Sequence, residues 1–218
     1  MQVAMDSGRL PEGRSHMGGL ATAHYDAGAC LLPTLRPLLG TQKRRRGYNV
    51  HPVRTHQHLS MACVLVKNLY SSRGYTTESV RQRLDDPNRL TLAAWLFGEL
   101  IATLTLGRDS PSGLLADALY AAEVASLRRP NRIVCEVSRL AVDPDFTSRE
   151  LLTTLFRAAH LHGKSVFTAS DVVIEVNPHH AGYYQRVLGF RQLGSLRQCP
   201  RVDAPAVLLH QTLDAMDF

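Results

Sequence analysis

The residue best suited to chemistry is Glu136, because it lies in a stretch that is otherwise apolar. Residues 133–142 are dense in β-branched side chains and stop before Pro144, which is typical of a buried strand. A carboxylate in such a strand must be paired, hydrogen-bonded or protonated. Two interpretations are open: a structural ion pair with an arginine such as Arg128 or Arg132, or a general base.

Ser138 and Arg139 follow Glu136 on the same strand. Strict alternation of side chains predicts two sets on opposite faces of the sheet. One set is Val134, Glu136, Ser138 and Leu140, and the other is Cys135, Val137 and Arg139. Ser138 is not expected to be a nucleophile, since no histidine–aspartate pair is spaced to activate it. The planar guanidinium of Arg139 suits either a substrate carboxylate or a neighbouring one such as Glu175.

A strand–helix–strand–helix unit between residues 132 and 190 must position these side chains. The first helix is predicted to start at Thr147, which forms a capping-box pattern with Glu150, and to end at Gly163. Residues 172–176 are predicted to form the second buried strand. Because a helix connects the two strands, we expect them to be parallel.

The second helix of this unit is predicted to open after Asn177 and to close at Gly189. It carries Tyr184, which is either a core aromatic or a functional hydroxyl. His179 and His180 are adjacent, and adjacent helical positions point about 100° apart, so one metal ion cannot easily take both. We expect no metal site.

The rest of the chain supplies further strands and helices. Residues 90–96 and 100–106 are joined tightly and predict an antiparallel hairpin. Further strands are expected at 48–54, 191–196 and 207–213, and further helices at 56–70, 77–84 and 114–127. These elements predict an α/β (α+β) fold with a mixed, mostly antiparallel twisted sheet and helices on both faces.

Two motifs resemble known acyltransferases. The segment 136–142, EVSRLAV, resembles the E-x-S-R-x-A-V strand of acyl-homoserine-lactone (autoinducer) synthases and long-chain N-acyl amino acid synthases. The segment 177–190, NPHHAGYYQRVLGF, is similar to the last motif of the GNAT acyltransferase superfamily, and its NPHHA part favours the N-acyl amino acid synthases. The resemblance covers roughly residues 48–194. It implies a GNAT-like three-layer fold in which the two parallel central strands splay apart.

The resemblance also implies roles for the candidate residues. Glu136 would take a proton from an amine acceptor, and Tyr184 would donate a proton to the departing thiolate. Substrate contacts are expected from Ser138, Arg139, Leu140, Val142 and Asn177.

The turn after the first strand bears on the acyl donor. GNAT enzymes that use coenzyme A usually have a glycine-bearing turn there, whose amides hold the pyrophosphate. The segment 145–152, DFTSRELL, has no glycine. This absence favours the phosphopantetheine arm of an acyl carrier protein as donor, with acyl-CoA as the alternative, and no tightly bound cofactor is expected.

The predicted function is transfer of a fatty acyl group from acyl carrier protein to the α-amine of an amino acid or a similar small amine. Three alternatives remain open: an acetyl-CoA-dependent N-acetyltransferase, a lactone-forming signal synthase, and a non-catalytic module that binds a carrier protein or lipid.

Charge and composition limit the partners and the setting. The chain of 218 residues carries a net charge of +6, and its densest basic run is Lys43, Arg44, Arg45 and Arg46. This run ends a predicted mobile tail, residues 1–47, ahead of one domain, residues 48–218. It is either a solvated linker or a docking segment for an acidic carrier protein or an anionic membrane surface. Without interleaved aromatics it does not predict nucleic-acid binding. Four scattered cysteines and no apolar signal core predict a cytoplasmic protein.

Overall fold

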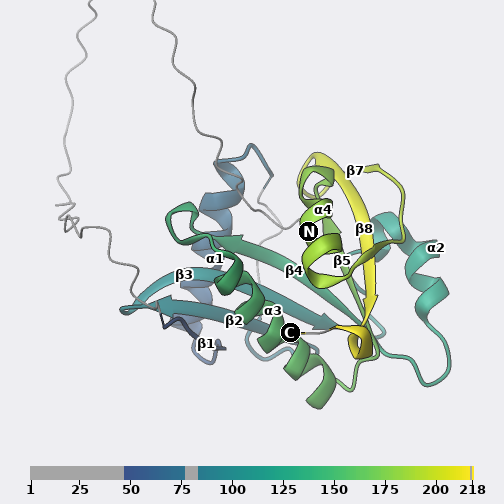
Figure 1. Ribbon diagram of the computed structural model, residues 1–218, viewed down its shortest axis with the longest axis horizontal. Helices are drawn as coiled ribbons and strands as arrows, with labels where there is room; N and C mark the ends of the chain where they lie inside the picture. The colour runs from purple at the N-terminus through teal and green to yellow at the C-terminus, as the bar shows by residue number, and fades with distance from the viewer. Residues whose placement is uncertain (1–46, 77–82, 217) are drawn as a thin grey trace, which may run out of the picture. The chain divides into compact units, whose positions relative to one another are not determined.

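The computed structural model describes residues 47–76, 83–216 and 218. Residues 1–46 of the predicted tail and most of the predicted helix 77–84 lie outside them. The strands form one sheet in the order β1-β2-β3-β4-β5-β8-β6, with β7 paired to β8 (Figure 1). The strands are β1 (Asn49–Pro52), β2 (Arg89–Leu96), β3 (Glu99–Arg108), β4 (Val134–Val142), β5 (Asp171–Val176), β6 (Arg191–Gln192), β7 (Arg197–Cys199) and β8 (Ala204–Thr212). The helices are α1 (His56–Ser71), α2 (Asp117–Leu127), α3 (Arg149–Ser165) and α4 (Pro178–Leu188), with short 3₁₀ turns at Pro144–Phe146 and Leu213–Ala215.

The pairing confirms a mixed, mostly antiparallel sheet. Strands β4 and β5 are parallel, and the other pairs in the described part of the chain are antiparallel. The β4–β5 ladder runs only from Val134–Asp171 to Val137–Ile174. Beyond that point β4 continues against β3 and β5 continues against β8, so the two parallel strands separate as predicted.

A bulge in β4 changes which face its side chains occupy. Opposite β4, Thr103 and Thr105 are two residues apart on β3, but their partners Ala141 and Ser138 are three apart. The extra residue lies at Arg139, whose φ is 51°, in the left-handed region. Strict alternation therefore fails beyond Ser138.

The bulge corrects two sequence predictions. Leu140 was expected on the face of Glu136, but it lies in the apolar cluster that also contains Cys135 and Val137. Arg139 was expected on the opposite face from Glu136. Burial lowers the pKa of Arg139, and the nearby Tyr70 of α1 and Glu136 act in the opposite direction. Because these interactions require proximity, the Arg139 guanidinium lies on the same side of the sheet as Tyr70 and Glu136.

Helices cover both faces of the sheet, which confirms the three-layer fold. One apolar cluster joins the sheet to α3 and α4, as Figure 1 shows with α3 lying across β2 and β3. On the other face, Val66 and Tyr70 of α1 pack with Ala141 of β4, and Tyr120 of α2 packs with Val134. Apolar side chains on both faces thus enclose β4 and β5.

The ends of α3 differ from the prediction. The N-cap is Ser148, not Thr147, because the Ser148 hydroxyl accepts a hydrogen bond from the Leu151 N–H at 3.1 Å. The helix also continues past Gly163 to Ser165. Close packing explains this glycine: a Cβ added there would lie 3.3 Å from the Leu213 side chain. The predicted end of α4 at Gly189 is correct, with φ at 72°.

We predict that Ser148→Ala lowers the free energy of unfolding by about 1 kcal/mol, because α3 loses its side-chain cap. Thr147→Ala is the matched control, and we expect it to have a smaller effect. Chemical denaturation of the three proteins measures both differences. A larger loss from Thr147→Ala would contradict this capping assignment.

Candidate active site

Glu136 is held by one backbone group from the other side of the site. Its side chain is 3% exposed, and its Oε2 accepts a hydrogen bond of 2.7 Å from the Leu115 N–H, just before α2. Its Oε1 has no hydrogen-bond partner among the described residues. Burial raises the pKa of Glu136, and the Leu115 hydrogen bond only partly opposes this. The result is a carboxylate with one oxygen available to accept a proton.

The alternative of a structural ion pair with Arg128 or Arg132 is wrong. Arg128 pairs with Asp117 at 2.6 Å, and Arg132 pairs with the buried Asp171. Arg128 also pairs with Asp109 at 2.7 Å, so both arginines are bound to aspartates and Glu136 belongs to neither group.

A polar row crosses the sheet beside Glu136. Ser138 is opposite Thr105 on β3, whose hydroxyl lies 3.2 Å from that of Thr91 on β2. Arg139 is 4% exposed, and burial lowers the pKa of its guanidinium. The bulge thus brings a buried cation to the same face as the buried Glu136 carboxylate.

A second buried carboxylate lies on this face, in a pair that the sequence did not predict. Glu175 on β5 accepts a hydrogen bond of 2.6 Å from Arg201, in the connection between β7 and β8. Burial raises the pKa of Glu175, but the Arg201 charge lowers it, and the net direction is downward. A glutamate inside the apolar run 172–176 was the available signal for this pair. Nothing in the sequence around Arg201 indicates its partner.

Asn177 joins two segments at the end of β5. Its Oδ1 caps α4 by accepting a hydrogen bond of 3.1 Å from the His179 N–H, as its sequence context predicts. Its Nδ2 donates to the Tyr75 hydroxyl at 3.3 Å. Asn177 is therefore a structural residue at the edge of the site, and its contact with a substrate stays a prediction.

Tyr184 belongs to the opposite layer from Glu136. It is fully buried in the cluster beneath α3 and α4, where its ring contacts Phe156, Tyr183 and Phe190. Burial raises the pKa of Tyr184 well above its ordinary value, and Tyr70 from the α1 side adds to this rise. The hydroxyl thus remains protonated, while its role as a general acid stays a prediction.

The turn after β4 uses its own amides. The Asp143 side chain accepts a hydrogen bond from the Asp145 N–H at 2.9 Å, and its carbonyl accepts one from the Phe146 N–H at 3.0 Å. Ser148 already binds the Leu151 N–H. These amides would have to exchange partners before they could bind a pyrophosphate.

Two cavities in the described part of the chain lie away from Glu136. The apolar one has a volume of about 10 Å³, close to the minimum for a single water, so it holds no acyl chain without side-chain movement. The other has a volume of about 220 Å³ and lies at the start of β2. The apolar cavity is lined by Leu106, Cys135, Val137, Phe156, Ala159, His160, Gly163, Val172, Phe190, Leu213 and Met216.

Three sequence features remain: the basic run, metal-ligand groups and membrane-spanning helices. The basic run at Lys43–Arg46 lies outside the described residues. Within the described ranges, no group of three or more histidine, cysteine, aspartate or glutamate side chains could hold a metal ion. In the same ranges, no helix has the length and apolar character to span a bilayer.

Comparison with known proteins identifies the family. Residues 61–212 match the family model described as N-acyl amino acid synthase FeeM. The chain belongs to this family. The solved structure of FeeM from uncultured soil microbes is 24% identical, covers 78% of this chain and 93% of its own, and has a TM-score of 0.71.

Other solved structures share the fold at lower identity. Arabidopsis thaliana NAA60 in complex with a bisubstrate analogue is 16% identical, with coverage of 76% and 98% and a TM-score of 0.56. A GNAT-family acetyltransferase from Streptococcus pneumoniae is 11% identical, with coverage of 76% and 99% and a TM-score of 0.53. No curated protein matches the chain. This member of the FeeM family is thus an acyltransferase enzyme with the GNAT fold, as its motifs predicted.

The buried carboxylate predicts a pH-dependent effect on stability. The folded-state pKa of Glu136 is raised, so its contribution is most favourable below the unfolded pKa and is lost as the pH rises through the folded value. Glu136→Gln keeps an acceptor for the Leu115 N–H but does not ionise. We therefore expect the variant to gain Tm relative to the wild type at about pH 8 and to lose this advantage at about pH 5.

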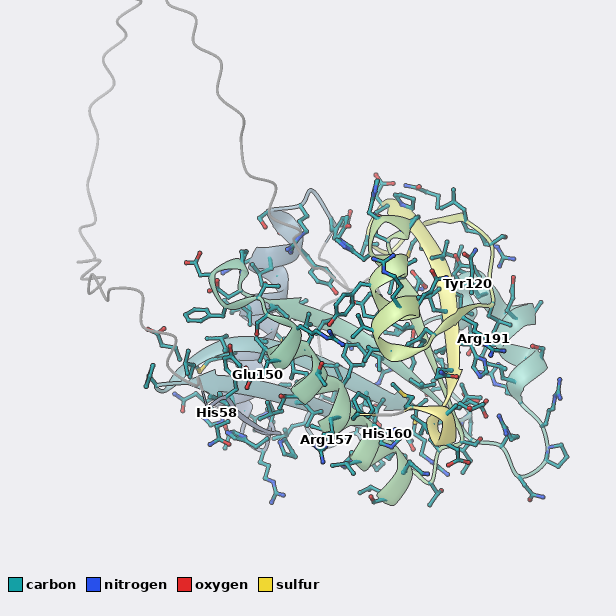
Figure 2. The ribbon with its side chains drawn as sticks, in the orientation of Figure 1. His58, Tyr120, Glu150, Arg157, His160 and Arg191 are labelled. Atoms are coloured by element: carbon teal, nitrogen blue, oxygen red, sulfur yellow. The ribbon has the colours of Figure 1, made fainter. Side chains whose placement is uncertain are left out.

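Thermal unfolding of both proteins at the two pH values measures this difference. Glu150→Gln, at the exposed start of α3 (Figure 2), is the control and should show no such change. A variant that is no more stable at high pH than at low pH, relative to wild type, would show that burial does not penalise the Glu136 anion.

Proposed function

We propose that this enzyme transfers a fatty acyl group from the phosphopantetheine arm of an acyl carrier protein to the α-amine of an amino acid. The observation that carries the proposal is the position of Glu136. It is a buried carboxylate with a raised pKa and one unoccupied oxygen, beside the point where β4 and β5 separate. Acyl transfer to an amine needs such a group, because the amine is protonated at neutral pH.

The reaction has three proton transfers. The ammonium group of the acceptor gives a proton to Glu136, and the free amine attacks the carbonyl carbon of the thioester. The new C–N bond forms, the C–S bond breaks, and the thiolate takes a proton from Tyr184. The protonated amide nitrogen loses its remaining extra proton to solvent, which leaves a neutral amide and a thiol. Glu136 then releases its proton and Tyr184 regains one through solvent, so both residues return to their starting states. The buried Tyr184 hydroxyl suits the donor role because its raised pKa keeps it protonated until the thiolate develops.

Arg139 gives the acceptor site a second charge. An amino acid presents an ammonium group and a carboxylate on neighbouring atoms, and the site has Glu136 and Arg139 on one face of β4. The guanidinium fork binds a carboxylate through two parallel hydrogen bonds. Ser138 lies between these two residues in sequence and offers a further hydroxyl. We propose that Arg139 selects amino acids over simple amines.

The turn after β4 supports a carrier-protein donor. Its amides are engaged by Asp143 and Ser148, and the two acidic residues Asp143 and Asp145 would repel a pyrophosphate. A phosphopantetheine arm carries a single phosphodiester and pairs its own amides along the separated strands. We further propose that Lys43–Arg46 contact the acidic carrier protein.

The acyl chain requires the apolar layer to open. Leu140 and Val142 share this layer with Phe156 and Phe190, on the side of the sheet that contains Tyr184. Because the cavity there is about 10 Å³, a long acyl chain enters only if the lining side chains change rotamer.

We predict that Glu136→Gln reduces N-acylation on the order of a hundredfold or more, the usual contribution of a positioned base. The rate is measured by mass spectrometry of the N-acyl product with saturating amino acid, and far-ultraviolet circular dichroism verifies the fold. Glu150→Gln is the control and should retain the wild-type rate. Equal rates for the two variants would remove Glu136 from the mechanism.

We predict that Arg139→Gln raises the KM for an amino acid about tenfold to hundredfold, because a charged hydrogen-bonded contact is lost. The KM for the corresponding decarboxylated amine should change little. Arg157→Gln, on the exposed face of α3 (Figure 2), is the control. If Arg139→Gln raised the KM for the amine and for the amino acid equally, Arg139 would not bind the substrate carboxylate.

We predict that kcat/KM is higher with an acyl carrier protein than with coenzyme A carrying the same acyl group. Both donors are compared at matched ionic strength, since the carrier contacts are electrostatic. If coenzyme A proved the equal or better donor, the argument from the turn would fail. The alternative of a coenzyme A-dependent N-acetyltransferase would then be preferred.

A further inference from the structure

Both backbone polar groups of Leu115, its N–H and its carbonyl, are hydrogen-bonded, and these bonds connect the two buried glutamates of the site. Its N–H donates to Glu136 at 2.7 Å, and its carbonyl accepts from Arg201 Nη1 at 2.7 Å. The second nitrogen of the same guanidinium, Nη2, donates to Glu175 at 2.6 Å. Glu136 and Glu175, at the two ends of this series of hydrogen bonds, are 3% and 0% exposed. Water therefore screens the interactions of these two carboxylates little.

Other charged groups also face Glu136. Arg139 interacts with it along β4, Glu175 from β5 raises its pKa, and Arg201 from the β7–β8 connection lowers it. Arg201 thus acts on Glu136 in two ways: its charge lowers the pKa of the carboxyl, and its hydrogen bond fixes the Leu115 backbone that binds the carboxylate. Glu175 holds Arg201 in place and neutralises part of that charge.

We propose that Arg201 is a positioning residue for the acyl transfer: it fixes the Leu115 backbone that binds the Glu136 carboxylate, and its charge tunes that carboxylate. The N–H and the carbonyl of Leu115 belong to the two successive peptide groups that meet at its Cα, so the bond from Arg201 fixes the direction in which the N–H points toward Glu136. Glu175 neutralises part of the Arg201 charge and so sets how strongly that charge lowers the pKa of Glu136. This inference rests on the proposed role of Glu136 as a base, and it names the residue that controls the position and the ionisation of that base.

A neighbouring arginine provides a matched control. Arg197 on β7 donates to the Leu119 carbonyl at 2.5 Å and pairs with Glu123, as Arg201 does with Leu115 and Glu175. Tyr120, labelled in Figure 2 on α2, also binds the carbonyl of Ala206 at 2.7 Å. Arg197 therefore fastens α2 to the same hairpin without touching Leu115 or Glu136. A purely structural effect of Arg201 would be reproduced by Arg197→Gln.

The first experiment measures kcat/KM against pH for three single variants. Arg201→Gln removes an attraction, so the acid limb set by Glu136 should move up by on the order of one pH unit. Glu175→Gln removes a repulsion, so the limb should move down. Arg201→Gln should also lower the pH-independent kcat/KM about tenfold to hundredfold, because the base is less well positioned. Arg197→Gln should leave the limb in place.

The second experiment needs no acyl transfer. The amide proton of Leu115, assigned by NMR and by the loss of its titration in Glu136→Gln, reports ionisation of the carboxylate it binds. Its midpoint should move up in Arg201→Gln and down in Glu175→Gln. If no amine is acylated under any condition, the proposed function fails, but this titration still tests the link.

A double variant tests the proposal if Arg201→Gln alone does not fold. Arg201→Gln leaves Glu175 buried without its partner, which is costly, whereas Glu175→Gln/Arg201→Gln removes the whole pair. In the double variant the midpoint should lie between those of the two single variants, with kcat/KM still reduced. Midpoints that do not move, that move in the same direction in both single variants, or that move equally in Arg197→Gln would overturn the proposal.

Discussion

The bulge at Arg139 is the constraint on which the rest of the site depends. A non-glycine residue in the left-handed region costs about 1–2 kcal/mol, and the pairing of β4 with β3 on both sides of the bulge keeps it there. The extra residue carries Arg139 to the face of Glu136 and moves Leu140 into the apolar layer. It lies just beyond the last β4–β5 pair, where the strands separate. One local irregularity thus defines a polar side, an apolar side and a gap between them.

The two buried glutamates show how one face supports different protonation states. Burial acts on both and raises the pKa of each. At Glu175 burial is opposed by the bonded Arg201 and by a hydrogen bond from Cys199, and the net pKa is lowered, whereas Glu136 receives only a peptide N–H and its pKa stays raised. A pair of carboxylates whose environments push their pKa values apart is typical of acid–base sites. This separation supports Glu136 as the base and Glu175 as a fixed anion.

The elements of the fold were predictable because their signals are local. β-Branched runs predicted β4 and β5, Asn177 and Gly189 predicted the ends of α4, and the motifs around Glu136 predicted the family. The bulge was not predictable, because no glycine marks Arg139 and alternation was the only available rule. Arg201 was missed because its two partners, Leu115 and Glu175, are far from it in sequence. Such contacts depend on how the β7–β8 hairpin meets α2, which periodicity does not specify.

The pKa of Glu136 in the folded protein tests the central claim most directly. It can be measured by ¹³C NMR titration of side-chain-labelled glutamate, with the resonance assigned by its absence in Glu136→Gln. We predict a pKa clearly above about 4.3, the value of an unperturbed glutamate. A value at or below it would show that Glu136 is an ordinary stabilised anion, and it would contradict both its burial-driven protonation and its role as a base.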